Sequence, residues 1–74
     1  MTTIYVFLLD EGTEVWRPVN ATIIKGSIYQ IDPESEIPDT ETWQFLPGNT
    51  VRCEEKQLLK GKHLVAIERV EEPL

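Results

Sequence analysis

The feature that most constrains the fold of this 74-residue chain is the regular spacing of turn residues between short stretches rich in β-branched and aromatic side chains. Six such stretches are visible, at residues 3–9, 14–24, 27–31, 43–45, 51–59 and 63–70. Each sequence between them contains glycine or proline, which interrupt strands and favour tight turns. No window of normal helix length shows the apolar period of a surface helix. The sequence therefore predicts an all-β fold.

Helix and strand compete only in the span 54–60. Its Glu, Lys, Gln and Leu residues are good helix formers, and Gly61 can end a helix. Such a helix has fewer than two turns and is marginal on its own. Because strands 51–59 and 63–70 flank the turn sequence Lys60-Gly61 closely, we favour a hairpin.

Five or six short antiparallel strands joined by short turns predict a small barrel, since closure leaves no long exposed strand edge. The length matches an SH3-like barrel. We expect one domain over residues 1–70 and a loose tail over 71–74. The connection 32–41 has two prolines, five acidic residues and no basic residue. It lacks the glycine-turned spacing of a calcium loop, so we expect a solvated loop.

Two strand sequences carry further information. In the first, residues 4, 6 and 8 are Ile, Val and Leu, while residues 5, 7 and 9 are Tyr, Phe and Leu. A strand that is apolar on both faces is central in a sheet or lies against a partner chain. In the second, Pro18 marks a sheet edge, a bulge or a bend, because proline has no N–H for a ladder hydrogen bond.

Charge and composition exclude several classes of function. The net charge is −6, with 13 acidic and 7 basic residues, which argues against a nucleic-acid partner. One cysteine and one histidine are too few for a disulfide or a structural zinc site, so no metal or cofactor is predicted. The longest apolar run is too short to cross a bilayer, and the first residues lack the basic region of a signal peptide. These features predict a cytoplasmic protein with no membrane contact.

Trp16 and Arg17, followed by Pro18, form the first candidate binding surface. Tryptophan and arginine are enriched where a few residues dominate an interface. The alternative is a core tryptophan at a strand bend, with Arg17 paired to an acid. We favour the core for Trp16, because so small a barrel needs its large rings inside.

Tyr29, Trp43 and Phe45 form the second candidate. On the surface, these rings would make an aromatic groove for an extended peptide. With Asp39 and Glu41 as an acidic rim, such a groove would take a basic or neutral peptide. The alternative, which we favour, is that the three rings pack in the core.

A nucleophilic pair is the only catalytic arrangement to consider. Cys53 and His63 lie on the two strands of the last predicted hairpin. A cysteine nucleophile also needs an orienting group and an oxyanion site, and no spacing in the chain supplies them. We interpret Cys53 as a small buried residue and His63 as a surface residue. No enzymatic activity is predicted.

Three segments resemble those of a known group of proteins. They are Val15-Trp-Arg-Pro-Val19, Trp43-Gln-Phe-Leu-Pro-Gly48 and Val51-Arg-Cys-Glu54. In these segments the chain resembles a group of short, uncharacterised bacterial proteins that share V-W-R-P-V, W-x-F-x-P-G and V-R-C-E sequences. The resemblance implies a small cytoplasmic β domain from a bacterium and carries no activity with it.

Two functional hypotheses remain. The first is a non-enzymatic module that binds a protein or peptide, as a monomer or weak homodimer. The second is a nucleic-acid-associated barrel that uses the basic residues of the C-terminal hairpin. These basic residues are interleaved with glutamates, which is typical of a mixed, solvated surface. The sequence therefore favours the first hypothesis.

Overall fold

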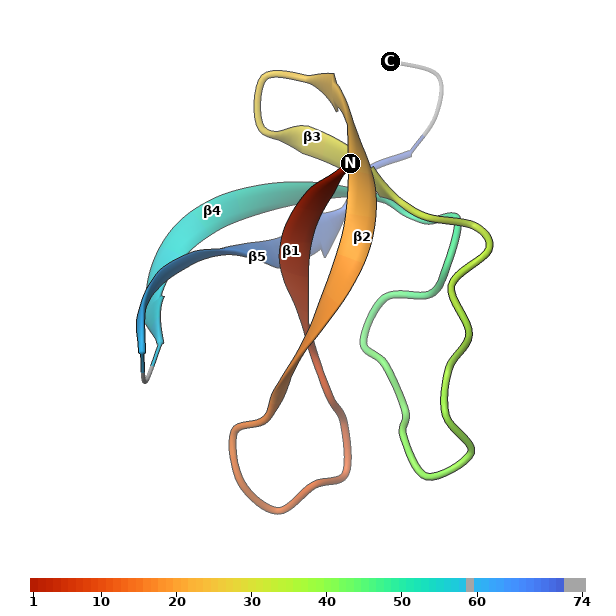
Figure 1. Ribbon diagram of the computed structural model, residues 1–74, viewed down its shortest axis with the longest axis vertical. Coiled ribbons are helices and arrows are strands. Elements are labelled where there is room, and N and C mark those ends of the chain that lie inside the picture. Colours follow the sequence, from red (N-terminus) through yellow and green to blue (C-terminus); the bar gives the residue numbers. More distant parts are fainter. Residues whose placement is uncertain (59, 72–74) are drawn as a thin grey trace.

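The computed structural model describes residues 1–58 and 60–71, which form five strands. They are β1 (Thr2–Phe7), β2 (Trp16–Lys25), β3 (Ile28–Ile31), β4 (Thr50–Leu58) and β5 (Gly61–Arg69). The strands close into a barrel in sequence order, consistent with a small SH3-like barrel (Figure 1). The all-β prediction is confirmed. None of the described residues forms a helix that could span a membrane.

One pairing in the barrel is parallel, at the seam where the barrel closes. There β1 and β5 pair in parallel, at Tyr5 and Val65. The other neighbouring strands are antiparallel. Because the chain reverses direction between consecutive strands, the first and last of an odd number of strands must run the same way.

The span 54–60 belongs to a hairpin, as favoured from the sequence. The strand β4 continues to Leu58 and β5 starts at Gly61, and the two strands pair from Val51 and Arg69 to Leu58 and Gly61. Gly61 has a φ of 122°, a conformation that residues with a Cβ atom rarely adopt. The predicted last residue of the strand, residue 59, and residues 72–74 of the predicted tail lie outside the described part of the chain.

The strand β2 changes its neighbours half-way along. It pairs with β1 over residues 16–21 and with β3 over residues 21–25. Pro18 lies in the half that β3 does not reach, so of the edge, bulge and bend considered for it, the structure shows the edge. The long connection 32–49 lies beside this half, and the Asp32 N–H donates to the Asn20 carbonyl at 2.9 Å. Figure 1 shows this connection in green, on the opposite side of the molecule from the β4–β5 hairpin.

The predicted strand 43–45 is not formed. Trp43 makes only an isolated bridge to Leu8. A turn follows at once, in which the Asn49 N–H donates to the Leu46 carbonyl at 3.0 Å and Gly48 has a φ of 88°. The segment is therefore too short to extend the pairing. It still places Trp43 and Phe45 against the barrel interior.

The core contains the inward-facing residues of every strand together with two rings from the long connection. In β1 the aliphatic positions Ile4 and Val6 are fully buried. The full cluster consists of Ile4, Val6, Leu8, Val19, Ala21, Tyr29, Ile31, Trp43, Phe45, Val51, Cys53 and Ala66. The long connection thus supplies the large rings that the strands themselves lack, apart from Tyr29.

Candidate functional site

The outer face of β1 carries two aromatic side chains that do not belong to the core. Tyr5 and Phe7 alternate with the buried aliphatic residues and are partly buried. Phe7 pairs with Trp16 on β2, and Tyr5 lies opposite Val65 on β5. Because paired residues share a face of a sheet, the Phe7 and Trp16 rings come together on this outer face.

Four rings therefore form a cluster outside the barrel. The Phe7 and Trp16 rings meet edge to face, with centroids 5.2 Å apart and an angle of 67° between the planes. The Tyr5 and His63 rings are tilted, with centroids 4.7 Å apart. Both spacings lie in the range in which aromatic pairs stabilise each other. We call Tyr5, Phe7, Trp16 and His63 the outer aromatic cluster.

A cleft of about 540 Å³ opens beside this cluster. It lies between the end of the β1–β2 connection and the β4–β5 hairpin, which project from the barrel in Figure 1. Val15 and Leu58 add aliphatic surface to its walls. Its lining residues are Tyr5, Glu14, Val15, Trp16, Gln57, Leu58, Lys60 and His63. We call it the aromatic cleft.

Two charged side chains, Glu14 of the aromatic cleft and Lys56 beside it, lie around Trp16. The Trp16 indole N–H donates to Glu14 Oε2 at 2.7 Å. Lys56 Nζ lies 3.7 Å from the same oxygen and 5.0 Å from the centroid of the indole ring. An ammonium in this position is attracted both by the carboxylate and by the π face of the ring. One lysine of the chain thus already occupies a cation position on Trp16.

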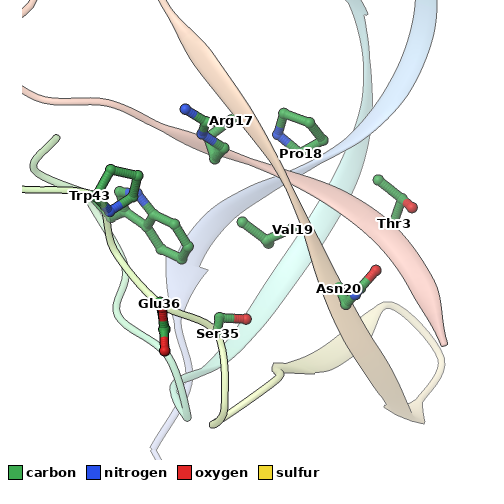
Figure 2. A pocket seen from close by; sticks show the side chains of 9 residues that line it. Thr3, Arg17, Pro18, Val19, Asn20, Ser35, Glu36 and Trp43 are labelled. Carbon is green, nitrogen blue, oxygen red and sulfur yellow. The ribbon is translucent and has the colours of Figure 1, made fainter. Parts of the chain in front are cut away.

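A second, polar cavity of about 340 Å³ lies at the free edge of β2. Figure 2 shows Arg17, Val19 and Asn20 on β2 across from Ser35, Glu36 and Trp43 of the long connection.

The free edge of β2 is held to the long connection by an ionic group beside this polar cavity. The Arg17 guanidinium is paired with Glu41, and the Trp43 indole N–H donates to Glu41 Oε1 at 3.0 Å. These two donors, Arg17 first, hold the pKa of the Glu41 carboxyl below its ordinary value. The pairing of Arg17 with an acid agrees with the sequence analysis, and its role here is structural.

The proposed groove of Tyr29, Trp43 and Phe45 does not exist as a surface. These side chains are exposed by only 9%, 5% and 8%, and all three belong to the core cluster. Glu41, expected on the rim of that groove, is engaged by Arg17 instead.

The core position favoured for Trp16 is also wrong. Trp16 is partly buried and faces outward, opposite Phe7. Since Trp43 enters the barrel from the long connection, the interior is filled without Trp16.

The residues that sequence reasoning missed are Tyr5, Phe7, Glu14 and Lys56. The signal for two of them was present in the first strand, where rings occupy one parity and aliphatic side chains the other. Glu14 and Lys56 have no such signal, because their approach to Trp16 depends on how the hairpin and the β1–β2 connection fold.

Cys53 and His63 are not brought together. Cys53 belongs to the core cluster, where burial raises the pKa of its thiol to about 11. His63 packs against Tyr5 in the outer aromatic cluster and pairs with Lys56 in the ladder. A thiol with this pKa is protonated at neutral pH and is a poor nucleophile.

The arginines of the C-terminal hairpin are engaged by carboxylates. Arg52 Nε lies 2.7 Å from Glu68 Oε2, and the same guanidinium is paired with Glu54. Arg69 Nη1 lies 3.1 Å from Glu71 Oε1. These groups form a mixed surface of paired charges, which is a poor surface for phosphates.

Comparison of the chain with protein-family models, with curated proteins and with solved structures finds no match. Among residues 1–58 and 60–71, no group of three or more His, Cys, Asp and Glu side chains is placed to bind a metal ion.

Proposed function

We propose that this protein is a non-enzymatic interaction module that binds a segment of a protein or peptide in the aromatic cleft. The observation that carries the proposal is the outer aromatic cluster, which borders a cleft of about 540 Å³ on a barrel whose core is already complete. Partly exposed rings are not needed to fill this core. Their position beside a cleft therefore supports a role in binding.

The chemistry of the cleft supports a polypeptide ligand. Aromatic residues, tryptophan and tyrosine above all, are enriched at the centres of protein interfaces. Val15 and Leu58 offer apolar contacts, while Glu14, Gln57 and Lys60 offer polar groups at the edges. Mostly apolar walls with a few polar groups are typical of sites that fix one orientation of a ligand.

The rest of the proposal concerns the cellular location, source, oligomeric state and partners of the protein. The single cysteine, which is buried, supports a reducing cytoplasm, and the proposed source is a bacterium. The proposed state is a monomer or weak homodimer without cofactor, metal or membrane partner. A nucleic-acid partner is less well supported, because Arg52 and Arg69 are held by glutamates and the net charge is −6.

Affinity capture with a matched pair of variants tests the binding site. Wild-type protein, Trp16→Ala and Ile24→Ala are immobilised and exposed to a bacterial lysate. Ile24 is an exposed apolar residue of the same strand that does not line the cleft. We expect a partner that is retained by the wild type and Ile24→Ala and lost by Trp16→Ala. Equal retention on all three proteins would place the binding site elsewhere.

A titration with nucleic acid tests the competing hypothesis. Labelled random DNA and RNA are added to the protein at ~150 mM salt. We expect no binding in the micromolar range. Micromolar affinity with a steep dependence on salt would replace the peptide proposal by the nucleic-acid one.

A further inference from the structure

We propose that the aromatic cleft recognises an arginine side chain of its partner, which takes the position that Lys56 occupies in the free protein. This inference rests on the proposed function and specifies the ligand of the same cleft. The structure shows that a cation can lie over the Trp16 ring and beside the Glu14 carboxylate at the same time, because the Lys56 ammonium does so.

The Lys56 contacts are weak enough to be exchanged. Its ammonium is 3.7 Å from Glu14 Oε2, and the two side chains are 48% and 56% exposed. Exposed ion pairs of this kind contribute little to stability. Lysine also has a long flexible stem, which allows its ammonium to move into water while the stem stays on the surface.

Arginine suits this position better than the internal lysine. Its guanidinium is planar, stacks on aromatic faces and is more weakly hydrated than an ammonium. It also donates several hydrogen bonds in a fixed fork, which matches a carboxylate such as Glu14. The Trp16 indole N–H already binds Glu14 Oε2 at 2.7 Å and so holds the carboxylate beside the ring.

Electrostatics and shape add two further arguments. The protein carries a net charge of −6, which favours the approach of basic partners over acidic ones. The cleft is also larger than one side chain needs, and Val15, Leu58 and Tyr5 leave apolar wall on which residues next to the arginine can pack. The ligand we infer is therefore an arginine flanked by apolar residues.

The opposite ligand, an acidic segment, is the main competitor. Lys60 lines the cleft together with Glu14, and Lys56 lies beside it. An acidic side chain would bind these lysines and displace Glu14 from Lys56. The two ligands make opposite predictions for the same two substitutions, and this difference decides between them.

The experiment uses the full chain, labelled with ¹⁵N, and follows its two indole N–H signals by NMR. The probe is an acetylated and amidated peptide with arginine between two leucines, compared with the same peptide carrying glutamate or norleucine at the centre. We expect the arginine peptide to shift the Trp16 signal. The signal of Trp43, which is buried in the core, serves as the internal control.

Two charge variants of the protein test whether a positive charge on the peptide favours binding. Lys56→Met removes the internal cation, and Glu14→Gln removes the carboxylate charge but keeps an oxygen for the Trp16 N–H. We expect Lys56→Met to tighten and Glu14→Gln to weaken binding of the arginine peptide, each by about two- to fivefold. Lys62→Met is the matched control, because Lys62 is exposed on the same hairpin and does not line the cleft. It should change the affinity by less than either variant.

The outcomes separate this inference from the proposed function. If the glutamate peptide binds best, and Lys56→Met weakens while Glu14→Gln tightens binding, the arginine inference is overturned and a peptide-binding cleft stands. If the norleucine peptide binds as well as the arginine peptide, charge recognition is overturned. If Trp16→Leu leaves the binding of every peptide unchanged, or no peptide shifts the Trp16 signal at millimolar concentration, the proposal that the cleft is a peptide-binding site is overturned.

Discussion

Replacing Trp43 with alanine removes the largest side chain of the core. Trp43 lies in an irregular segment, yet it is only 5% exposed and belongs to the same cluster as Val19 and Leu8. Its indole N–H also donates to Glu41 at 3.0 Å. The substitution therefore creates a cavity between the long connection and the half of β2 that β3 does not cover.

The size of the effect follows from the buried area. A tryptophan side chain buries roughly 150–250 Å², which at about 25 cal/mol per Å² amounts to ~4–6 kcal/mol. Measured costs of large aromatic-to-alanine changes in cores are about 3–5 kcal/mol, and we expect a value in that range. A domain of 74 residues has a free energy of unfolding of about 4–11 kcal/mol, so Trp43→Ala removes at least about a quarter of it.

The assay is urea denaturation followed by far-UV circular dichroism. Trp43→Phe is the milder companion variant, with an expected loss of ~1–2 kcal/mol, or a fall in Tm of about 5–15 °C. Trp16→Ala is the matched control, because Trp16 is a partly buried tryptophan outside the core cluster. It should destabilise the protein clearly less than Trp43→Ala does. A loss below about 1 kcal/mol for Trp43→Ala, or a larger loss for Trp16→Ala, would refute the assignment of the two rings.

Three further predictions concern the backbone, the ionic group on β2 and the thiol. Gly61→Val should lower the free energy of unfolding by ~1–3 kcal/mol, because φ at Gly61 is 122°. The loss should come from backbone strain alone, since a Cβ atom there meets nothing within 4 Å. An unchanged denaturation midpoint would contradict this. The pKa of Glu41 is lowered in the folded state, so its contribution to stability is present above the ordinary value of 4.5 and lost as the pH falls toward the lower, folded-state pKa. When Tm is measured over a series of acidic pH values, Glu41→Gln should make the fall of Tm with decreasing pH less steep. An unchanged fall would show that Arg17 does not hold Glu41. Cys53, whose pKa is raised to about 11 by burial, should react with a thiol reagent at pH 8 only in denaturant; rapid reaction of the native protein would mean that the thiol is accessible.

The strands and turns could be predicted from the sequence because their signals are local. Gly48 and Gly61, which have positive φ angles, lie in two of the segments in which glycine or proline was expected to form a turn. The hairpin in the span 54–60 was also favoured correctly, since a helix of that length has too little stability of its own. The missing N–H of Pro18 limited its place to an edge, a bulge or a bend, and the edge is the one formed.

The positions of the large rings could not be predicted in the same way. Trp16 and Trp43 both follow a β-branched residue and precede a proline by a few positions, so their local sequences are similar. What separates them is non-local. The strand β3 has only four residues, and the uncovered half of β2 is filled by the segment that carries Trp43.

Both faces of the strand β1 are apolar, and this pattern in the sequence relates directly to the candidate site. Its aliphatic face, with Ile4 and Val6, is fully buried in the barrel. Its aromatic face, with Tyr5 and Phe7, is covered only in part, by His63 and Trp16. A strand that needed nothing beyond the barrel would carry polar residues on this outer face, as half-solvated antiparallel strands do. Tyr5 lines the aromatic cleft, so the partner that we propose for this cleft would complete the burial of that ring.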